Sequence, residues 1–218
     1  MSLRAHDVTA GHDGTPVFTG VNFTVEPGRV TGLTGPSGGG KTTLARVLAG
    51  LHRPSAGQVS LDGDPLPARP GGEIALLYQS PRQAVTPRWT LARIIGEPLR
   101  ARPAGSRRSG PPDEIVLETA RLVGLTPDLL DRRPHQVSDG QLQRACLARA
   151  LVQRPRYLLC DEMTAMLDPA TTASLTAVLT ARARAGLGVL AVSHHRALLD
   201  AWADVRFLLD GGALTALP

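Results

Sequence analysis

A glycine-rich segment between an apolar stretch and a helical stretch constrains this chain more than any other feature. The segment covers residues 35–42, GPSGGGKT, and fits the pattern G-x-x-x-x-G-K-[ST]. Glycines let the backbone curl so that several N–H groups point at one anion, and the following helix adds the positive end of its dipole. Lys41 is also the only lysine among 24 lysine and arginine residues. The pattern predicts a nucleotide triphosphate site in which Lys41 holds the β- and γ-phosphates and the Thr42 hydroxyl binds Mg²⁺.

The composition indicates a globular chain with an anionic partner. Of the 218 residues, 42% are hydrophobic and 20% are charged, which excludes a disordered or fibrous protein. No apolar run approaches the roughly 18 residues that span a bilayer, and the N-terminus lacks a signal-peptide core, so we expect a cytoplasmic protein. The net charge of +5 suits a nucleotide, a nucleic acid or a membrane surface. Cys146 and Cys160 lie in apolar contexts and predict two buried thiols.

Strand and helix patterns alternate at both ends of the chain, and a helical block interrupts the middle. Residues 1–34 predict antiparallel strands, the last of which, 29–34, runs into the glycines. Further predicted strands cover residues 58–61, 73–78, 156–160 and 188–192, and a strand pair closes the chain. Predicted helices cover residues 41–51, 88–101, 114–123, 138–153 and 170–185, with a short helix before the last strands. The Pro- and Gly-rich residues 102–113 predict a loop. This order is typical of an α/β protein with a parallel sheet and an inserted helical subdomain.

One apolar strand pattern ends in two carboxylates. Residues 157–160 are apolar, and Asp161 and Glu162 follow them directly. Adjacent charges at the end of a buried strand cost free energy unless a ligand uses them. Beside a phosphate loop, Asp161 can bind the Mg²⁺ shell and Glu162 can act as the general base that polarises an attacking water. The alternative is a solvated pair at the end of a strand.

The segment before the long helical pattern at 138–153 has two interpretations. Ser138 and Gln141 fit the capping box S-x-x-Q, which is a common way to begin a helix. The segment VSDGQ at 137–141 also precedes the carboxylate pair with one helix between them, and that order suggests a role at the nucleotide site.

These motifs together resemble those of ATP-binding cassette (ABC) ATPases, the nucleotide-binding subunits of ABC transporters, over nearly the whole chain. VSDGQLQR is similar to the signature motif LSGGQ of that family. The resemblance implies one ATP-binding domain over residues 1–218. Its P-loop core, a RecA-like parallel sheet with an antiparallel β subdomain, would cover residues 1–80 and 155–218, and the helical signature subdomain would cover residues 81–154.

The resemblance also implies roles for individual residues. Gln79 matches the Q-loop glutamine that touches Mg²⁺, and His194 matches the switch histidine that contacts the γ-phosphate. Asp168 matches the D-loop aspartate, which we also expect to cap the next helix. His12 stands where the family has an aromatic that stacks on adenine, and we expect His195 to be a surface residue. The implied nucleotide-binding residues are Gly35, Pro36, Ser37, Gly38, Gly39, Gly40, Lys41, Thr42, Thr43 and His12. The implied metal ligands are Thr42, Gln79 and Asp161, and the implied catalytic residues are Glu162, His194, Gln79 and Lys41.

Two positions depart from the family pattern. His12 offers less stacking area than tyrosine, which would weaken adenine binding. The signature residues Ser138, Asp139, Gly140 and Gln141 would face the ATP of a partner subunit, and Asp139 replaces the usual glycine. At ~6 Å and an effective dielectric near 20, its repulsion from a phosphate charge is on the order of 3 kcal/mol, against ~0.3–1 kcal/mol gained from the helix dipole. We therefore expect Asp139 to turn outward or to contact a cation, and still to weaken closure on the partner's ATP.

A finer resemblance concerns residues 78–100, which are similar to the Q-loop stretch of the importer branch for oligopeptides, dipeptides and nickel. It implies an ATPase that powers import of a peptide, nickel or a related small solute. The implied partners are a second ABC ATPase, identical or different, two membrane permease subunits and an external solute-binding protein. The chain would then lie at the cytoplasmic face of the membrane, with residues 80–100 against the permease.

Two other functions remain open on the sequence. One is a soluble ABC ATPase that acts on nucleic acid or ribosomes, with phosphate contacts from Arg100, Arg102, Arg107 and Arg108. These arginines have no interleaved aromatics, so we expect no nucleic acid. The other is a regulatory subunit with weak hydrolysis, which the departures at His12 and Asp139 would favour.

The phosphate loop gives a first prediction. Replacing Lys41 with alanine removes the only lysine and the charge that would hold the β- and γ-phosphates, so Mg²⁺-dependent ATP binding should be lost. Isothermal titration calorimetry on the purified variant measures this directly. An unchanged ATP affinity would mean that the loop is an ordinary strand–helix turn.

Overall fold

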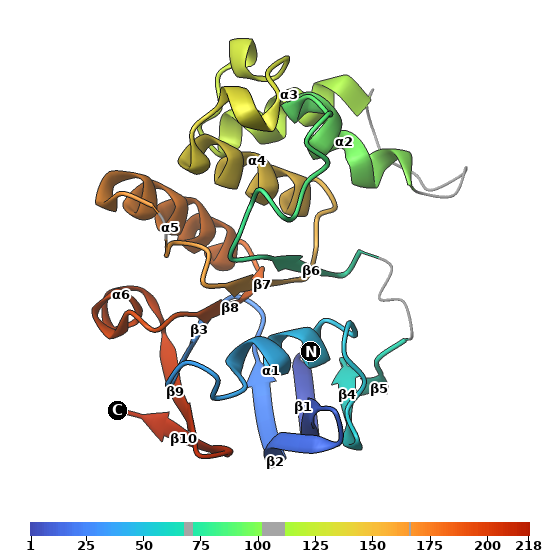
Figure 1. Ribbon diagram of the computed structural model, residues 1–218, viewed down its shortest axis with the longest axis vertical. Coiled ribbons are helices and arrows are strands. Elements are labelled where there is room, and N and C mark those ends of the chain that lie inside the picture. The colour runs from blue at the N-terminus through green and yellow to red at the C-terminus, as the bar shows by residue number, and fades with distance from the viewer. Residues whose placement is uncertain (68–71, 102–111, 166) are drawn as a thin grey trace.

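The computed structural model describes residues 1–67, 72–101, 112–165 and 167–218. In these residues the strands form two sheets (Figure 1). The four-stranded sheet, in the order β2-β1-β4-β5, contains β1 (Leu3–His12), β2 (Thr15–Val25), β4 (Ala56–Leu61) and β5 (Asp64–Pro65). The six-stranded sheet, in the order β10-β9-β3-β8-β7-β6, contains β3 (Val30–Thr34), β6 (Ile74–Leu77), β7 (Tyr157–Asp161), β8 (Gly188–Val192), β9 (Val205–Asp210) and β10 (Ala213–Leu217).

Helices cover both faces of the six-stranded sheet. The α-helices are α1 (Lys41–Leu48), α2 (Leu91–Arg100), α3 (Pro112–Leu122), α4 (Asp139–Leu151), α5 (Pro169–Arg184) and α6 (Arg196–Trp202), with 3-10 turns at Pro127–Leu129 and Pro134–Gln136. Figure 1 shows α2, α3 and α4 gathered on one side of the sheet, and α1 on the other side, between the two sheets. Among the described helices, none combines the length and the apolarity that a membrane crossing requires.

The predicted α/β class and its parallel core are confirmed. Strands β6, β7, β8, β3 and β9 run parallel, and β10 pairs antiparallel with β9 at the edge. The antiparallel prediction for residues 1–34 holds for β1 and β2 but is wrong for β3, because Val30 pairs with Val189 in the parallel sheet. All five residues of β3 are buried, and burial on both faces is typical of a central parallel strand.

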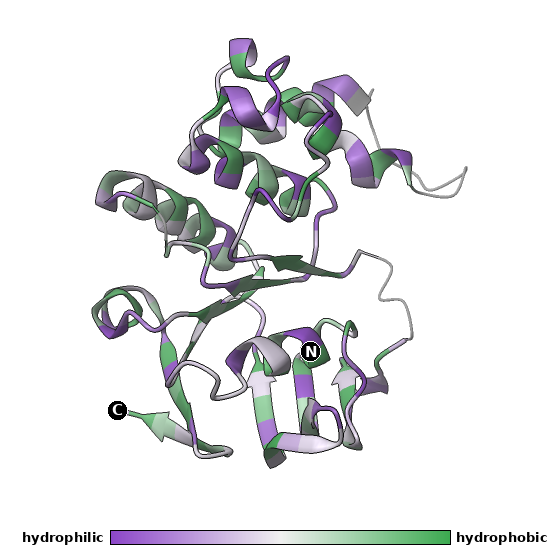
Figure 2. Cartoon of the chain, in the orientation of Figure 1, coloured by the Kyte–Doolittle hydropathy of each residue, from purple (hydrophilic) through white to green (hydrophobic). Residues whose placement is uncertain are grey.

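Alternate residues of the parallel strands face two different cores. Tyr157 and Leu159 of β7 pack with α1 and the four-stranded sheet, whereas Leu158 and Cys160 pack with the helices on the other face. Figure 2 shows the apolar character of β6 and of the middle of β7, which ends at Asp161. Cys146 and Cys160 are both free and buried, as predicted. The central strands β3, β7 and β8 are therefore buried on both faces, and loops project from their ends.

The helical block predicted at residues 81–154 contains α2, α3 and α4, which pack mainly on one another. Its limits as a subdomain remain a prediction, because nothing separates it from the rest of the chain as an independent unit. Residues 102–111 of the predicted loop, and with them Arg102, Arg107 and Arg108, lie outside the described residues. Arg100 ends α2, where its guanidinium donates to the Arg93 carbonyl at 3.4 Å.

Candidate functional site

The phosphate loop joins β3 to α1 and requires glycine at both of its ends. Gly35 has φ 153°, and a Cβ there would lie 2.1 Å from the Leu209 carbonyl oxygen. Gly40 has φ 91°, and a Cβ there would lie 2.9 Å from the Phe18 ring. Only glycine fits such close approaches, so the loop can curl tightly into the start of α1.

The Lys41 ammonium lies inside this loop. Its Nζ donates to the Gly35 carbonyl at 2.9 Å and to the Pro36 carbonyl at 2.8 Å, and the residue is only 7% exposed. A buried ammonium needs such acceptors. A phosphate would offer stronger, charged acceptors at the same place, so these two hydrogen bonds are the ones that an entering anion would replace.

Three residues predicted as metal ligands line one cavity of about 350 Å³. These are Thr42 from α1, Gln79 from the loop after β6, and Asp161 at the end of β7. The Thr42 hydroxyl donates to Asp161 Oδ1 at 3.1 Å. All three side chains supply oxygen, the donor that Mg²⁺ prefers, and one carboxylate with room for phosphate and water is its usual protein share. The site fits Mg²⁺.

Burial raises the pKa of the Asp161 carboxyl above its ordinary value, and the hydrogen bond from Thr42 opposes part of that shift. The charged form of this carboxyl is therefore disfavoured mainly because burial removes water from it. Arg46 also lines the cavity and lies close enough to lower the pKa of Asp161. Sequence patterns missed Arg46, although it faces the same way as Thr42 one helical turn later.

Glu162 and His194 lie together where β7 and β8 end. The two strands are paired, with Asp161 opposite Val192, so the residues that follow them meet. Glu162 Oε1 accepts from the His194 backbone N–H at 3.0 Å, and Oε2 lies 2.8 Å from His194 Nδ1. Glu162 has φ 50°, and its side chain is 12% exposed against 63% for His194. The carboxylate is sheltered while the imidazole faces outward.

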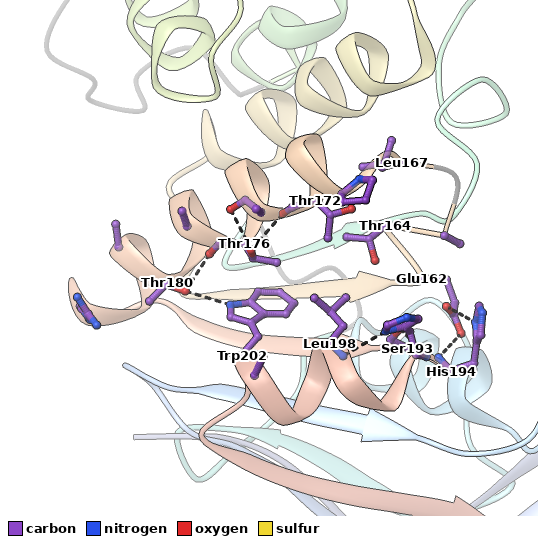
Figure 3. A pocket seen from close by; sticks show the side chains of 18 residues that line it. Glu162, Thr164, Leu167, Thr172, Thr176, Thr180, Ser193, His194, Leu198 and Trp202 are labelled. Atoms are coloured by element: carbon purple, nitrogen blue, oxygen red, sulfur yellow. Dashed lines mark hydrogen bonds and ion pairs between the residues drawn. The ribbon is translucent and has the colours of Figure 1, made fainter.

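A second cavity of about 800 Å³ opens beside this pair, between α5 and α6 (Figure 3). Its lining is mainly apolar, and the Trp202 indole N–H donates to the Thr180 hydroxyl at 3.0 Å along one wall. It contains Glu162 and His194 but no residue of the phosphate loop. Thr42, Gln79 and Asp161 line the smaller cavity and Glu162 and His194 line this one, so the candidate site for the chemistry lies where the two sets meet, at the adjacent residues Asp161 and Glu162. His195 is exposed, as expected, and caps α6 by accepting from the Leu198 N–H at 3.1 Å.

The signature residues begin α4. Ser138 and Gln141 form the capping box, with the Ser138 hydroxyl accepting from the Gln141 N–H at 3.2 Å and the Gln141 amide oxygen accepting from the Ser138 N–H at 3.0 Å. Gly140 is close-packed, since a Cβ there would lie 3.3 Å from Thr171 Cγ2. None of the four signature residues lines the cavity of Thr42 and Asp161. Their role toward a partner's nucleotide stays a prediction.

Asp139, the departure from the family pattern, contacts a cation. Its Oδ1 lies 2.7 Å from Nε of Arg82, which follows the Q-loop glutamine in the chain. Arg82 lies in the importer-like stretch at residues 78–100, but no role was predicted for it; that resemblance and its charge were the available signals. Asp168 caps α5 as expected, accepting from the Thr171 N–H at 2.9 Å and the Thr171 hydroxyl at 2.7 Å, and the hydroxyl bond is the main cause of its lowered pKa.

His12 lies beside the first turn of α1. Its Nε2 is 3.3 Å from the Thr43 hydroxyl, and its ring packs edge-on against His52 at a centroid distance of 5.3 Å. His52 was not predicted, because it follows α1 in a segment with no recognisable motif. The two rings are inclined at 62°, so His52 packs against His12 next to the phosphate loop without extending its flat face.

Comparison with known proteins assigns the class. The ABC transporter family model matches residues 18–165, so the chain belongs to the ABC transporter family and is an ATP-binding, ATP-hydrolysing subunit. It is 37% identical to the nickel import ATP-binding protein NikE of Brucella suis biovar 1, over 97% of this chain and 82% of that protein. Its fold is similar to the dimeric bacterial ABC transporter cassette MJ0796, with a TM-score of 0.86, 23% identity and 99% of each chain covered. It is also similar to cbiO1 of Clostridium perfringens, part of the cbiONQ transporter complex, with a TM-score of 0.85, 23% identity, and 98% and 86% of the two chains covered.

The raised pKa of Asp161 predicts that its ionised carboxylate lowers the stability of the fold but is needed for Mg²⁺ binding. A carboxyl whose pKa rises on folding favours the folded state below its ordinary value of 3.8, and loses that contribution as the pH rises through its raised value. Asp161→Asn should therefore raise the melting temperature at pH 7 without added Mg²⁺, and the gain should shrink as the pH falls toward 3.8. The same variant should lose Mg²⁺-dependent ATP binding.

Differential scanning calorimetry across pH measures the first effect, and titration calorimetry measures the second. Asp128→Asn, at an exposed carboxylate on another element, serves as the control and should change neither quantity. A lower melting temperature for Asp161→Asn at pH 7 would contradict the desolvation argument.

Proposed function

We propose that this chain hydrolyses ATP in the cavity between the phosphate loop and the end of β7. The observation that carries the proposal is the convergence of Lys41, the Thr42–Asp161 pair and the sheltered Glu162 at the carboxyl ends of neighbouring parallel strands. Ligands of open α/β sheets bind at these ends. Lys41 leaves the Gly35 and Pro36 carbonyls and takes the β- and γ-phosphate oxygens instead.

Glu162 acts as the general base. Each carboxylate oxygen has a second acceptor position beyond the bond it makes to His194, so Glu162 can bind the attacking water and take its proton as the oxygen attacks the γ-phosphorus in line. When Glu162 is ionised, its contact with Nδ1 requires the His194 proton on that nitrogen. His194 Nε2 then donates to the γ-phosphate only as an imidazolium, which adds positive charge where the transition state needs it.

Mg²⁺, held by the Thr42 hydroxyl, Asp161 and the Gln79 side-chain oxygen, would neutralise charge on the phosphates. Asp161 provides the only carboxylate of this set, and its raised pKa favours a cation beside it. Gln79 lines the cavity and is exposed. Its side chain can therefore contact the γ-phosphate and also respond to a subunit that contacts residues 80–100. His12 and His52 stack on or beside adenine.

We propose further that ATP joins this chain head-to-tail to a second ABC ATPase through the signature residues Ser138, Asp139, Gly140 and Gln141. These residues begin a helix of thirteen residues, whose N-terminus carries the positive end of the helix dipole and favours an anion. Asp168, on the loop that precedes α5, lies on the same side as Gly140, since Gly140 approaches Thr171.

The transported cargo is nickel or a related small solute. This proposal rests on the relatives, which are named as nickel import ATP-binding proteins, and on the importer-like stretch at residues 78–100. The chain would work at the cytoplasmic face of the membrane against permease subunits, with an external solute-binding protein delivering cargo. A different second ATPase is expected, as in the peptide importer branch that the sequence resembles.

Affinity purification of the tagged chain from its native membrane tests this proposal. We expect two permease subunits, a second ATPase and a solute-binding protein in the eluate, and nickel uptake by vesicles that contain the complex. Co-purification of ribosomes or nucleic acid without permeases would support the soluble alternative and contradict transport.

Glu162→Gln tests the base. The variant should bind ATP normally and turn over ~10²–10⁴-fold more slowly, the usual cost of a lost general base. Glu118→Gln, at an exposed carboxylate on α3, is the control and should hydrolyse ATP at the normal rate. A phosphate-release assay on the purified complex measures both. Near-normal turnover by Glu162→Gln would mean that another group activates the water, and weak turnover by the unmodified complex would indicate a regulatory subunit.

A further inference from the structure

Arg82 grips the start of the signature helix with every nitrogen of its guanidinium. Nε lies 2.7 Å from Asp139 Oδ1, Nη1 donates to the Pro134 carbonyl at 3.0 Å, and Nη2 donates to the Val137 carbonyl at 3.4 Å. A planar guanidinium with three acceptors is fixed in position, so its charge stays beside Asp139. A freely moving surface cation would not be held in this way.

The ion pair contributes little to folding. The side chains of Arg82 and Asp139 are 48% and 47% exposed, and surface pairs of this kind are usually worth less than about 1 kcal/mol. Asp139 would also be tolerated without Arg82, because a carboxylate in the first turn favours the helix dipole. The ion pair by itself therefore gives folding no strong reason for the guanidinium at this place, although the bonds to the Pro134 and Val137 carbonyls also hold the chain before α4.

The position of the pair supplies a different reason. Asp139 is the first residue of α4, at the helix end that the proposed function turns toward the triphosphate of a partner subunit. A lone carboxylate there repels that triphosphate, whereas a neutral pair leaves the dipole of α4 and its free N–H groups to attract it. Like charges placed across an interface oppose association directly.

We propose that Arg82 is a positioning residue for the signature half-site, where it neutralises Asp139 so that this half-site can close on the ATP of the partner subunit. The inference rests on the proposed function and adds a residue to it. It also modifies the expectation from the sequence, because the repulsion from Asp139 appears in full only when Arg82 is removed. Residues 80–84, which we expect to contact the permease, thus have a second role, because Arg82 among them neutralises Asp139 and allows the signature to bind the partner's ATP.

Arg149 provides a matched control. It lies three turns along α4, and its Nη1 donates to the Ala84 carbonyl at 2.7 Å and to Glu97 Oε2 at 3.4 Å. Like Arg82, it ties α4 to the segment after Gln79, but it does not contact Asp139. Arg149→Ala therefore reports the cost of loosening this segment without changing the charge at the signature.

The experiment is a charge-rescue cycle on the full chain, assembled with the second ATPase that co-purifies with it, or with a second copy where none does. The variants are Arg82→Ala, Asp139→Asn, the double variant, and Arg149→Ala with and without Asp139→Asn. Each is assayed for the KM and kcat of ATP hydrolysis between ~50 and ~500 mM salt, a range over which exposed charges become screened.

Arg82→Ala should raise KM about tenfold at low salt, and the increase should shrink at high salt. Asp139→Asn should lower KM, because it leaves the positive charge of Arg82 unpaired beside the start of α4. The double variant should fall within about twofold of the unmodified chain, since neither has a net charge at this place, whereas Asp139→Asn should not rescue Arg149→Ala. This pattern would show that the effect of Arg82 on KM comes from its charge, because the double variant recovers although it lacks the hydrogen bonds to the Pro134 and Val137 carbonyls.

A double variant as impaired as Arg82→Ala would overturn the inference, because the carbonyl hydrogen bonds would then account for the whole effect of Arg82. An unchanged KM in Arg82→Ala would overturn it as well. The unmodified chain separates this outcome from a failure of the proposed function: absence of ATP turnover there refutes both, whereas turnover without rescue refutes the role of Arg82 alone.

Discussion

The parallel pairing of β3, β7 and β8 determines where every charged group of the site lies. The three strands end at the same edge of the sheet, and a part of the site follows each of them. The phosphate loop follows β3, Asp161 and Glu162 lie at the end of β7, and His194 follows β8. The register sets Asp161 opposite Val192, which brings Glu162 within hydrogen-bond distance of the residue two positions further on. A slip of one residue would send these side chains to the opposite face of the sheet.

Within this edge, each polar group is paired with another group of the chain. Lys41 uses two loop carbonyls, Thr42 uses Asp161, and Glu162 uses both the backbone and the ring of His194. These pairings keep the site from paying the full cost of buried charge, and they hold each side chain near the place where a phosphate or a cation would meet it. Burial raises the pKa of Asp161, so a cation bound at that position would stabilise its charged form.

Local sequence patterns predicted the fold and much of the site because their signals are local. Each of these signals lies within a few residues: the glycines of a tight loop, an apolar strand that ends in carboxylates, and a capping box. The structure forms the predicted elements, with ends shifted by up to three residues. The exceptions involve contacts between distant segments. The membership of β3 in the parallel sheet depends on Val189, the Asp139 contact depends on Arg82, and the approach of His52 to His12 depends on how α1 packs. No periodicity or spacing records such pairings, since they arise only when the helices and sheets have packed.

Under the proposed function, the phosphate loop and the signature each bind one side of a nucleotide, and they differ in how they accommodate its negative charge. At the phosphate loop, a lysine, a helix N-terminus and backbone N–H groups all favour an anion, and a single carboxylate is reserved for a cation. At the signature, the helix N-terminus carries a carboxylate of its own, which by itself would oppose an anion. The arginine that offsets it comes from the segment after Gln79, and not from α4, so the electrostatic state of the signature depends on where residues 80–84 lie. A glycine at position 139 would make the half-site independent of that segment. If Arg82 has the proposed role, an aspartate at this position makes the half-site conditional, because any displacement that separates the pair restores the repulsion. The Arg82 and Asp139 side chains are 48% and 47% exposed, so a subunit that contacts them would be able to cause such a displacement.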